Sequence, residues 1–250
     1  MFKKVFAVVF SFITIFAPFS VVLADFNPNK LIEDKTFSDT QTFGSALGIQ
    51  QFLDSKKSVL ANINVGFLQK LREPTDVNLK TNLSDPEANL GRLRSAAELI
   101  WAASVKTGIN PQVIIVTLQK EQSLITGTFS TDSKIQSALD HAMGFGCPDS
   151  GGCDSLFFGF YPQLFGAYDA QGNKYIGAPG SLMRSFTTPN GRGPGVDAQN
   201  QTFGTPIIRT SKINDIVSFK NTTGGPQNPQ AFQTVTLSNA ATAALYRYTP

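Results

Sequence analysis

The chain has 250 residues, of which 41% are hydrophobic and 16% are charged, which is enough for one large domain or two small ones with a buried core. The net charge is only +3 and the Lys and Arg residues are scattered, so the sequence lacks the basic stripe typical of nucleic-acid-binding proteins. One His and two Cys leave few ligands for a zinc, haem or iron–sulfur centre. We therefore expect no metal site, no cofactor and no nucleic-acid partner.

Residues 1–24 have the pattern of a secretory signal peptide. Lys3 and Lys4 precede a long apolar run, and Val22-Leu23-Ala24 fits the residues before a cleavage site. The apolar run is nearly long enough to span a bilayer, so an uncleaved membrane anchor is the alternative. Pro18 inside the run favours cleavage. In both cases we expect the remaining chain to work outside the cytoplasmic membrane, secreted or in the cell envelope, and to touch the membrane only through an uncleaved leader.

Residues 25–80 are expected to form an irregular N-terminal arm that packs on the main domain. The arm contains one amphipathic helix over 45–53, because Ile49, Phe52 and Leu53 fall on one side at helical spacing. Turn-forming residues surround this helix on both sides.

Two long helices are predicted next. The first begins at a capping box made by Ser84 and Glu87 and ends at Gly108. The second begins at Asn110-Pro111, an N-cap followed by Pro at the first helical position, and continues to about residue 125. The apolar run over 113–116 would also suit a buried strand, but the cap and the good helix formers after it favour a helix.

Shorter elements are expected in the second half, where the composition becomes rich in Gly, Pro, Asn and Gln. In chain order they are a helix from Thr131 or Asp132, an aromatic stretch over 156–168, short strands over 205–208 and 232–237, and a final helix over 239–248.

Cys147 and Cys153 are expected to form a disulfide. They are the only two cysteines of an apparently exported chain, and the short loop between them contains Gly151 and Gly152. The alternative is that one thiol is a nucleophile with His141 as its base, as in thiol peptidases. A paired thiol does not attack a substrate, so the disulfide is the preferred interpretation.

Glu121 is the residue for which catalytic chemistry is easiest to argue. It lies on the same helix side as Ile114 and Leu118, near the helix end. Burial against aliphatic side chains and the negative end of the helix dipole both favour a protonated carboxyl group. Such a group can protonate a glycosidic oxygen. The alternative is a helix-surface Glu that neighbours Lys120.

The segment from Gly108-Ile109-Asn110-Pro111 to Glu121 resembles the catalytic helix of lysozyme-like lytic transglycosylases. The stretches 108–125, 144–153 and 243–250 further resemble exported lysozyme-like proteins of little-studied bacteria. The resemblance implies an α+β, mainly α, lysozyme-like helical core over 81–190, followed by a Gly/Asn/Gln-rich C-terminal segment over 191–250. It also implies a monomer that cleaves peptidoglycan glycan strands, with Glu121 as acid and base.

Aromatic and amide side chains after the Cys loop are expected to bind the glycan. They are Tyr161, Tyr168 and Gln163, because sugar rings present apolar faces and hydroxyl groups together. The late tyrosine of the transglycosylase family is not assigned, and Tyr161, Tyr168 and Tyr175 are available for it.

A hydrolase would need a second carboxylate, for which spacing selects no residue. The choices are Asp132, Asp140, Asp149 and Asp154. Gln122 stands where transglycosylases have Ser, which favours the rival hypothesis of a non-catalytic glycan-binding or adhesion protein of the cell envelope.

Overall fold

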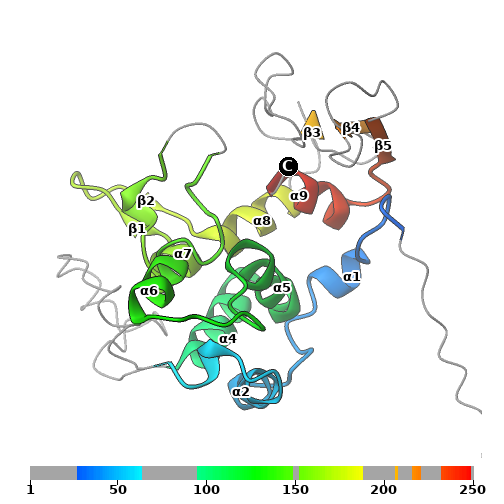
Figure 1. The fold of residues 1–250 in the computed structure, drawn as a ribbon. Helices are drawn as coiled ribbons and strands as arrows, with labels where there is room; N and C mark the ends of the chain where they lie inside the picture. The colour runs from blue at the N-terminus through cyan, green and yellow to red at the C-terminus, as the bar shows by residue number, and fades with distance from the viewer. Residues whose placement is uncertain are drawn as a thin grey trace, which may run out of the picture.

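The computed structural model describes residues 27–63, 95–148, 152–187, 206–207, 216–220 and 232–248. The described part is mainly helical, with two small antiparallel sheets (Figure 1). The expected signal peptide over 1–24 and the expected capping box at Ser84 and Glu87 lie outside the described residues. Within the described residues, no helix combines the length and the apolar character that crossing a membrane requires.

Ten helical elements and five strands have defined bounds in the described residues. The helices are α1 (Asp34–Phe37), α2 (Ala46–Ser55), α4 (Ala96–Thr107), α5 (Pro111–Gln122), α6 (Asp132–Asp140), α7 (Phe160–Phe165), α8 (Ala178–Thr187) and α9 (Ala240–Tyr248), with short 3-10 helices η1 (Val59–Ala61) and η3 (Ser155–Phe157). The strands are β1 (Ala167–Tyr168), β2 (Lys174–Tyr175), β3 (Pro206–Ile207), β4 (Ile216–Lys220) and β5 (Phe232–Thr236). β1 pairs with β2, and the second sheet has the order β3-β4-β5 with Ile216 opposite Thr236.

The helix α4 begins later than predicted. Its N-cap is Ser95, which forms a capping box with Glu98, so the helix does not run from the expected box at 84–87. The expected end is confirmed, because Gly108 follows in the left-handed conformation with φ 76°. The box at Ser95 lies directly before the buried Ala96 and Ala97, so α4 begins where its core-facing residues begin.

The helix α5 confirms the predicted start and excludes the strand alternative for 113–116. Asn110 caps it by accepting from the Gln112 backbone N–H at 2.7 Å, and Pro111 occupies the first turn. Ile114 and Leu118 are fully buried in the main hydrophobic core. In Figure 1, α5 lies in the middle of the helical elements, and α4 packs against it.

The N-terminal arm and the C-terminal helix are joined by hydrogen bonds between residues far apart in the sequence. The Leu31 backbone N–H donates to the Thr242 hydroxyl at 3.0 Å, and the Ala241 N–H donates to the Asp34 carboxylate at 2.8 Å. α9 also packs along α8, a helix that the Gly- and Pro-containing sequence did not predict (Figure 1). These contacts pack Tyr248, the last residue of α9, against the main hydrophobic core.

We expect Asn110→Ala to lower the free energy of unfolding by about 2 to 4 kcal/mol. The Asn110 side chain is fully buried, caps α5, and donates to the Thr36 carbonyl and the Thr42 hydroxyl at 2.8 Å each. Its removal therefore loses a helix cap and two part-buried hydrogen bonds that join α5 to the N-terminal arm. Urea denaturation followed by circular dichroism measures the effect.

The matched control is Thr131→Ala at the N-cap of α6. Thr131 is exposed and accepts one cap bond from the Lys134 N–H at 3.4 Å. Its loss is expected to cost about 1 kcal/mol or less. Equal losses for the two variants would contradict the role assigned to Asn110 in joining α5 to the N-terminal arm.

Candidate active site

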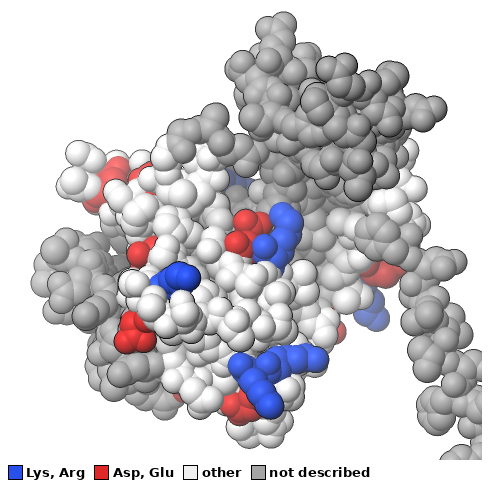
Figure 2. Space-filling view, in the orientation of Figure 1, with Lys and Arg blue, Asp and Glu red and all other residues white. Residues whose placement is uncertain are grey.

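Glu121 lies in the last turn of α5, which ends at Gln122 with Ser123 in the left-handed conformation. Its side chain is 22% exposed, so the carboxylate lies at the surface edge of the core. Lys120 Nζ donates to Glu121 Oε1 at 3.2 Å, and the Lys120 side chain is 57% exposed. Figure 2 shows acidic and basic side chains in contact near the middle of this face, by one end of α5. The Glu121 carboxylate is therefore partly buried and paired with the ammonium group of Lys120.

The backbone of Gly144 lies directly against the other oxygen of the same carboxylate. Gly144 has φ +69°, and a Cβ atom placed there would come within 2.6 Å of Glu121 Oε2. Only glycine satisfies both the conformation and the close approach. The two carboxylate oxygens thus face different surroundings, Lys120 on one side and the Gly144 loop on the other.

The Gln163 side chain fixes the main chain on both sides of Gly144, at Met143 and Phe145. The Gln163 side chain is fully buried, and its Oε1 accepts from the Met143 and Phe145 N–H groups at 3.0 Å each. Its Nε2 donates to the Phe145 and Phe157 carbonyls at 2.8 and 2.9 Å. Every hydrogen-bonding position of the amide is used by the main chain. The expectation that Gln163 binds the glycan is therefore wrong in this structure, since the side chain offers neither exposed surface nor a spare donor or acceptor.

Tyr248, at the end of α9, is the site residue that the sequence did not identify. Its hydroxyl donates to the Met143 carbonyl at 2.8 Å, which places the ring against the same loop. Burial raises the pKa of Tyr248 well above its ordinary value, and the negative charge of Glu121 raises it further. The phenol is therefore neutral, close to Glu121, and held by the loop that also contacts Glu121.

The tyrosines that the sequence indicated lie elsewhere. Tyr161 is only 9% exposed and packs on Phe165 with ring centroids 4.6 Å apart, so it belongs to the core and forms no groove wall. Tyr168 is partly exposed in β1 with Lys174 Nζ 5.8 Å from its ring centre. Tyr175 is exposed and donates to Asp169 at 3.2 Å. The side chains of Tyr168 and Tyr175 thus contact Lys174 and Asp169, and that of Tyr161 packs in the core.

Two pockets share Tyr248 in their walls, and Glu121 itself is not among the lining residues of either. The first, of about 370 Å³, is lined by Gly144, Phe145, Gly146, Cys147, Pro148, Ser181, Ser185, Arg247 and Tyr248. The second, of about 450 Å³, is lined by Leu31, Ile32, Gln112, Val113, Val116, Thr117, Lys120, Leu245, Tyr246 and Tyr248. Both volumes are within the range of about 300 to 1,000 Å³ that is usual for small-molecule sites. Glu121 contacts Gly144 of the first wall and Lys120 of the second.

None of the possible second carboxylates that the structure describes lines either pocket. Asp140 accepts from the Gln136 amide at 2.9 Å on α6, and Asp154 caps η3 by accepting from the Leu156 N–H at 2.9 Å. Asp132 is exposed in the first turn of α6. Asp149 lies outside the described residues.

The predicted disulfide between Cys147 and Cys153 is present. One potential ligand atom each from His141, Cys147 and Cys153 lie within 4.8 Å of one another, and His141 Nδ1 donates to the Ser137 carbonyl at 2.8 Å. Because the two sulfur atoms are bonded to each other, neither is a thiolate that could attack a substrate or bind a metal ion. The disulfide instead closes the loop whose first half, Gly144 to Cys147, forms a wall of the first pocket.

No family model, no curated protein and no solved structure matches this chain. The chemistry of the site therefore has to be inferred from the chain's own contacts.

We expect Gly144→Ala to be more destabilising than Gly172→Ala. Both glycines have positive φ, +69° and +81°, so both alanines carry the same kind of backbone strain, about 1 kcal/mol. A Cβ at Gly172 has open space, whereas one at Gly144 meets the Glu121 carboxylate. The difference between the two free energies of unfolding therefore measures the contact at Glu121. Equal values would contradict this contact.

We expect Glu121→Gln to lower the pKa of Tyr248, because it removes the nearby negative charge. Ultraviolet titration of the phenols measures this, with Tyr248→Phe used to assign the last transition. In the folded protein the Tyr248 pKa is raised, so its contribution to stability is complete below about pH 10 and is lost as the pH rises further. Identical titration curves for Glu121→Gln and the unaltered protein would contradict the proximity of the two residues.

Proposed function

We propose that this protein cleaves peptidoglycan glycan strands outside the cytoplasmic membrane, with Glu121 as the single acid and base. The observation that carries the proposal is one partly exposed carboxylate whose Oε2 lies at Gly144, a wall residue of the first pocket, and whose Oε1 accepts from Lys120, a wall residue of the second. We propose that a glycan strand binds with one sugar in each pocket and its linking oxygen near Glu121.

The mechanism begins with proton donation from Glu121 to the glycosidic oxygen between the two sugars. The bond from this oxygen to the anomeric carbon of the muramic acid residue breaks through a transition state with oxocarbenium character. The resulting Glu121 carboxylate then removes the proton from the muramic 6-hydroxyl, whose oxygen bonds to the anomeric carbon. The product is a 1,6-anhydro sugar, and Glu121 regains its proton for the next cycle.

We prefer an intramolecular product over hydrolysis because none of the candidate second carboxylates that the structure describes lines a pocket. Hydrolysis by inversion or retention uses a second carboxylate close to the anomeric carbon. Of the four candidate aspartates, Asp132, Asp140 and Asp154 do not line the two pockets, and Asp149 lies outside the described residues. The muramic 6-hydroxyl then replaces the water that a second carboxylate would activate.

Tyr248 and Lys120 both interact electrostatically with the Glu121 carboxyl group. Tyr248 remains a neutral phenol because burial and the Glu121 charge both raise its pKa. Lys120 is more than half exposed, so it can leave Glu121 Oε1 for solvent when the carboxyl group is protonated. The expected catalytic form is therefore one in which the ammonium group has moved away from Glu121.

The resemblance to lysozyme-like proteins is consistent with this proposal. The described part is mainly helical, and we propose that α4 to α8 form a lysozyme-like core with the N-terminal arm packed beside it. The signal peptide expected over 1–24 supports export.

The second candidate is a glycan-binding envelope protein without catalytic activity. The Lys120–Glu121 ion pair favours it, because the ammonium group contacts the charged carboxylate and not a proton donor. This candidate keeps both pockets and predicts binding without product.

The test is a digest of purified peptidoglycan by the purified protein, with released muropeptides identified by mass spectrometry. The unaltered protein is expected to release anhydro-muropeptides, and Glu121→Gln is expected to reduce the rate by about a hundredfold or more. Glu33→Gln is the matched control, because Glu33 also pairs with a lysine, Lys30 at 2.7 Å, but lies 64% exposed in the N-terminal arm.

Anhydro products from the unaltered protein and from Glu33→Gln, but not from Glu121→Gln, would support the glycosidase. Products with reducing ends would exclude the intramolecular step. Equal products from Glu121→Gln would exclude Glu121 as the acid. A folded protein that binds the strands and releases nothing would support the non-catalytic candidate.

A further inference from the structure

We propose that His141, Cys147 and Cys153 form a zinc site when the disulfide is reduced. One potential ligand atom from each of these three residues lies within 4.8 Å of the other two. In the oxidised protein the two sulfur atoms are bonded to each other, whereas reduction leaves two thiols beside an imidazole. Two thiolates and an imidazole are a ligand set that suits Zn²⁺. This site goes beyond the proposed function and does not depend on it.

Backbone hydrogen bonds hold the two cysteines close together in addition to the disulfide. Each cysteine has a direct neighbour in one such bond, because the Asp154 N–H donates to the Gly146 carbonyl at 2.8 Å. The Cys147 N–H also donates to the Gly144 carbonyl at 3.3 Å. Neither bond involves a sulfur atom, so we expect the two thiols of the reduced protein to remain near each other.

The imidazole of His141 is oriented by two contacts. His141 Nδ1 donates to the Ser137 carbonyl at 2.8 Å, so Nε2 of the neutral ring keeps a lone pair for a metal ion. The ring packs edge-on against Phe158 with centroids 4.8 Å apart. A bond from one ring nitrogen to a backbone carbonyl is the usual outer contact of a metal-binding histidine. The ring is therefore held in the tautomer that a metal ion requires.

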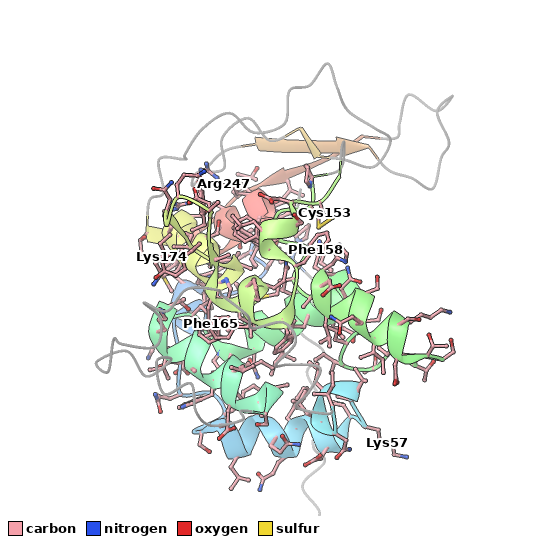
Figure 3. The ribbon with its side chains drawn as sticks, turned by 90° about the vertical axis from the view of Figure 1, so that its left-hand side faces the viewer. Lys57, Cys153, Phe158, Phe165, Lys174 and Arg247 are labelled. Atoms are coloured by element: carbon pink, nitrogen blue, oxygen red, sulfur yellow. A yellow bond between two sulfur atoms is a disulfide. The ribbon has the colours of Figure 1, made fainter. Side chains whose placement is uncertain are left out.

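The main chain also connects His141 to the cysteine loop. The Gly144 N–H donates to the His141 carbonyl at 2.8 Å, and the Gly159 N–H donates to the Asp140 carbonyl at 3.2 Å. Figure 3 shows Cys153 and Phe158 near each other at one end of the helical part, with Lys57 at the opposite end. The three ligand residues are partly exposed, so a reductant and Zn²⁺ can reach them and water can supply a fourth ligand.

Reduction and metal binding are two separate steps. A dithiol reductant transfers two electrons and two protons to the disulfide, and it is itself oxidised to a disulfide. Each cysteine thiol then loses its proton to solvent as its sulfur binds Zn²⁺. The zinc ion and the disulfide thus exclude each other, and each of them closes the same loop between Cys147 and Cys153.

The composition of the chain makes this site simple to test. His141 is the only histidine, and Cys147 and Cys153 are the only cysteines. In a protein without an affinity tag, Zn²⁺ that binds through sulfur or imidazole therefore has to use these residues.

The test is a calorimetric titration of the untagged protein with Zn²⁺, before and after reduction by a water-soluble phosphine that is then removed under nitrogen. The phosphine takes oxygen from water and becomes a phosphine oxide, which leaves two protein thiols. We expect one Zn²⁺ per reduced chain and no measurable binding by the oxidised chain. Titration with Co²⁺ is expected to give sulfur-to-metal charge-transfer absorption in the reduced protein alone.

His141→Gln separates a three-residue site from a pair of thiols that binds zinc without the imidazole. It is expected to lower the Zn²⁺ affinity of the reduced protein by about a hundredfold or more, while the disulfide still forms on oxidation. Asp140→Asn is the matched control, because Asp140 adjoins His141 but its carboxylate accepts from the Gln136 amide and is not part of the cluster. We expect Asp140→Asn to change the affinity by less than about fivefold.

Thermal unfolding gives a second measurement that remains valid if reduction destabilises the protein. Zn²⁺ is expected to raise the unfolding temperature of the reduced protein, or to restore its folded circular dichroism spectrum, and to leave the oxidised protein unchanged. Reduced protein that neither binds Zn²⁺ nor is stabilised by it would overturn the site. Equal affinities of reduced unaltered protein and reduced His141→Gln would overturn the role of the imidazole, and equal binding by oxidised and reduced protein would overturn the role of the thiols.

Discussion

The amide of Gln163 is the interaction on which the site depends. Its four hydrogen bonds hold the main chain at Met143, Phe145 and Phe157, and they use all of the donors and acceptors of a fully buried side chain. A loop rich in glycine has no strong conformational preference of its own, so these bonds supply the order that the sequence lacks. Gly144 can then lie within contact distance of the Glu121 carboxylate.

Three segments that are distant in the sequence meet at this loop. α5 brings Glu121, the loop brings Gly144, and α9 brings Tyr248, whose hydroxyl donates to Met143. α9 is in turn tied to the N-terminal arm and packed on α8. The N-terminal arm therefore helps to hold α9, and α9 holds Tyr248 against the loop at Met143, although neither element supplies the acid.

Local signals in the sequence were sufficient where one short stretch decides the structure. Asn110-Pro111, Thr131 and Gly108 mark helix ends correctly, and the cysteine pair is bonded as predicted. The helix position and the resemblance together predict Glu121 as the acid, and this role stays a prediction. Gln163 was assigned the wrong role and Tyr248 was missed, because partners far along the chain determine whether an amide is buried or a terminal tyrosine reaches a site. α8 was missed because Pro179 and Gly180 weaken its helical signal, while packing against α9 stabilises it.

The most direct test of the account is a crystal structure of Glu121→Gln with a peptidoglycan tetrasaccharide. The account predicts a sugar in each of the two pockets that share Tyr248, with the linking oxygen about 3 Å from the side-chain amide at position 121. It also predicts that Gln163 keeps its four main-chain bonds. A tetrasaccharide bound along another surface, or a strand whose linking oxygen does not approach position 121, would contradict the central claim that the buried amide of Gln163 orders the loop so that Glu121 acts between two sugar subsites.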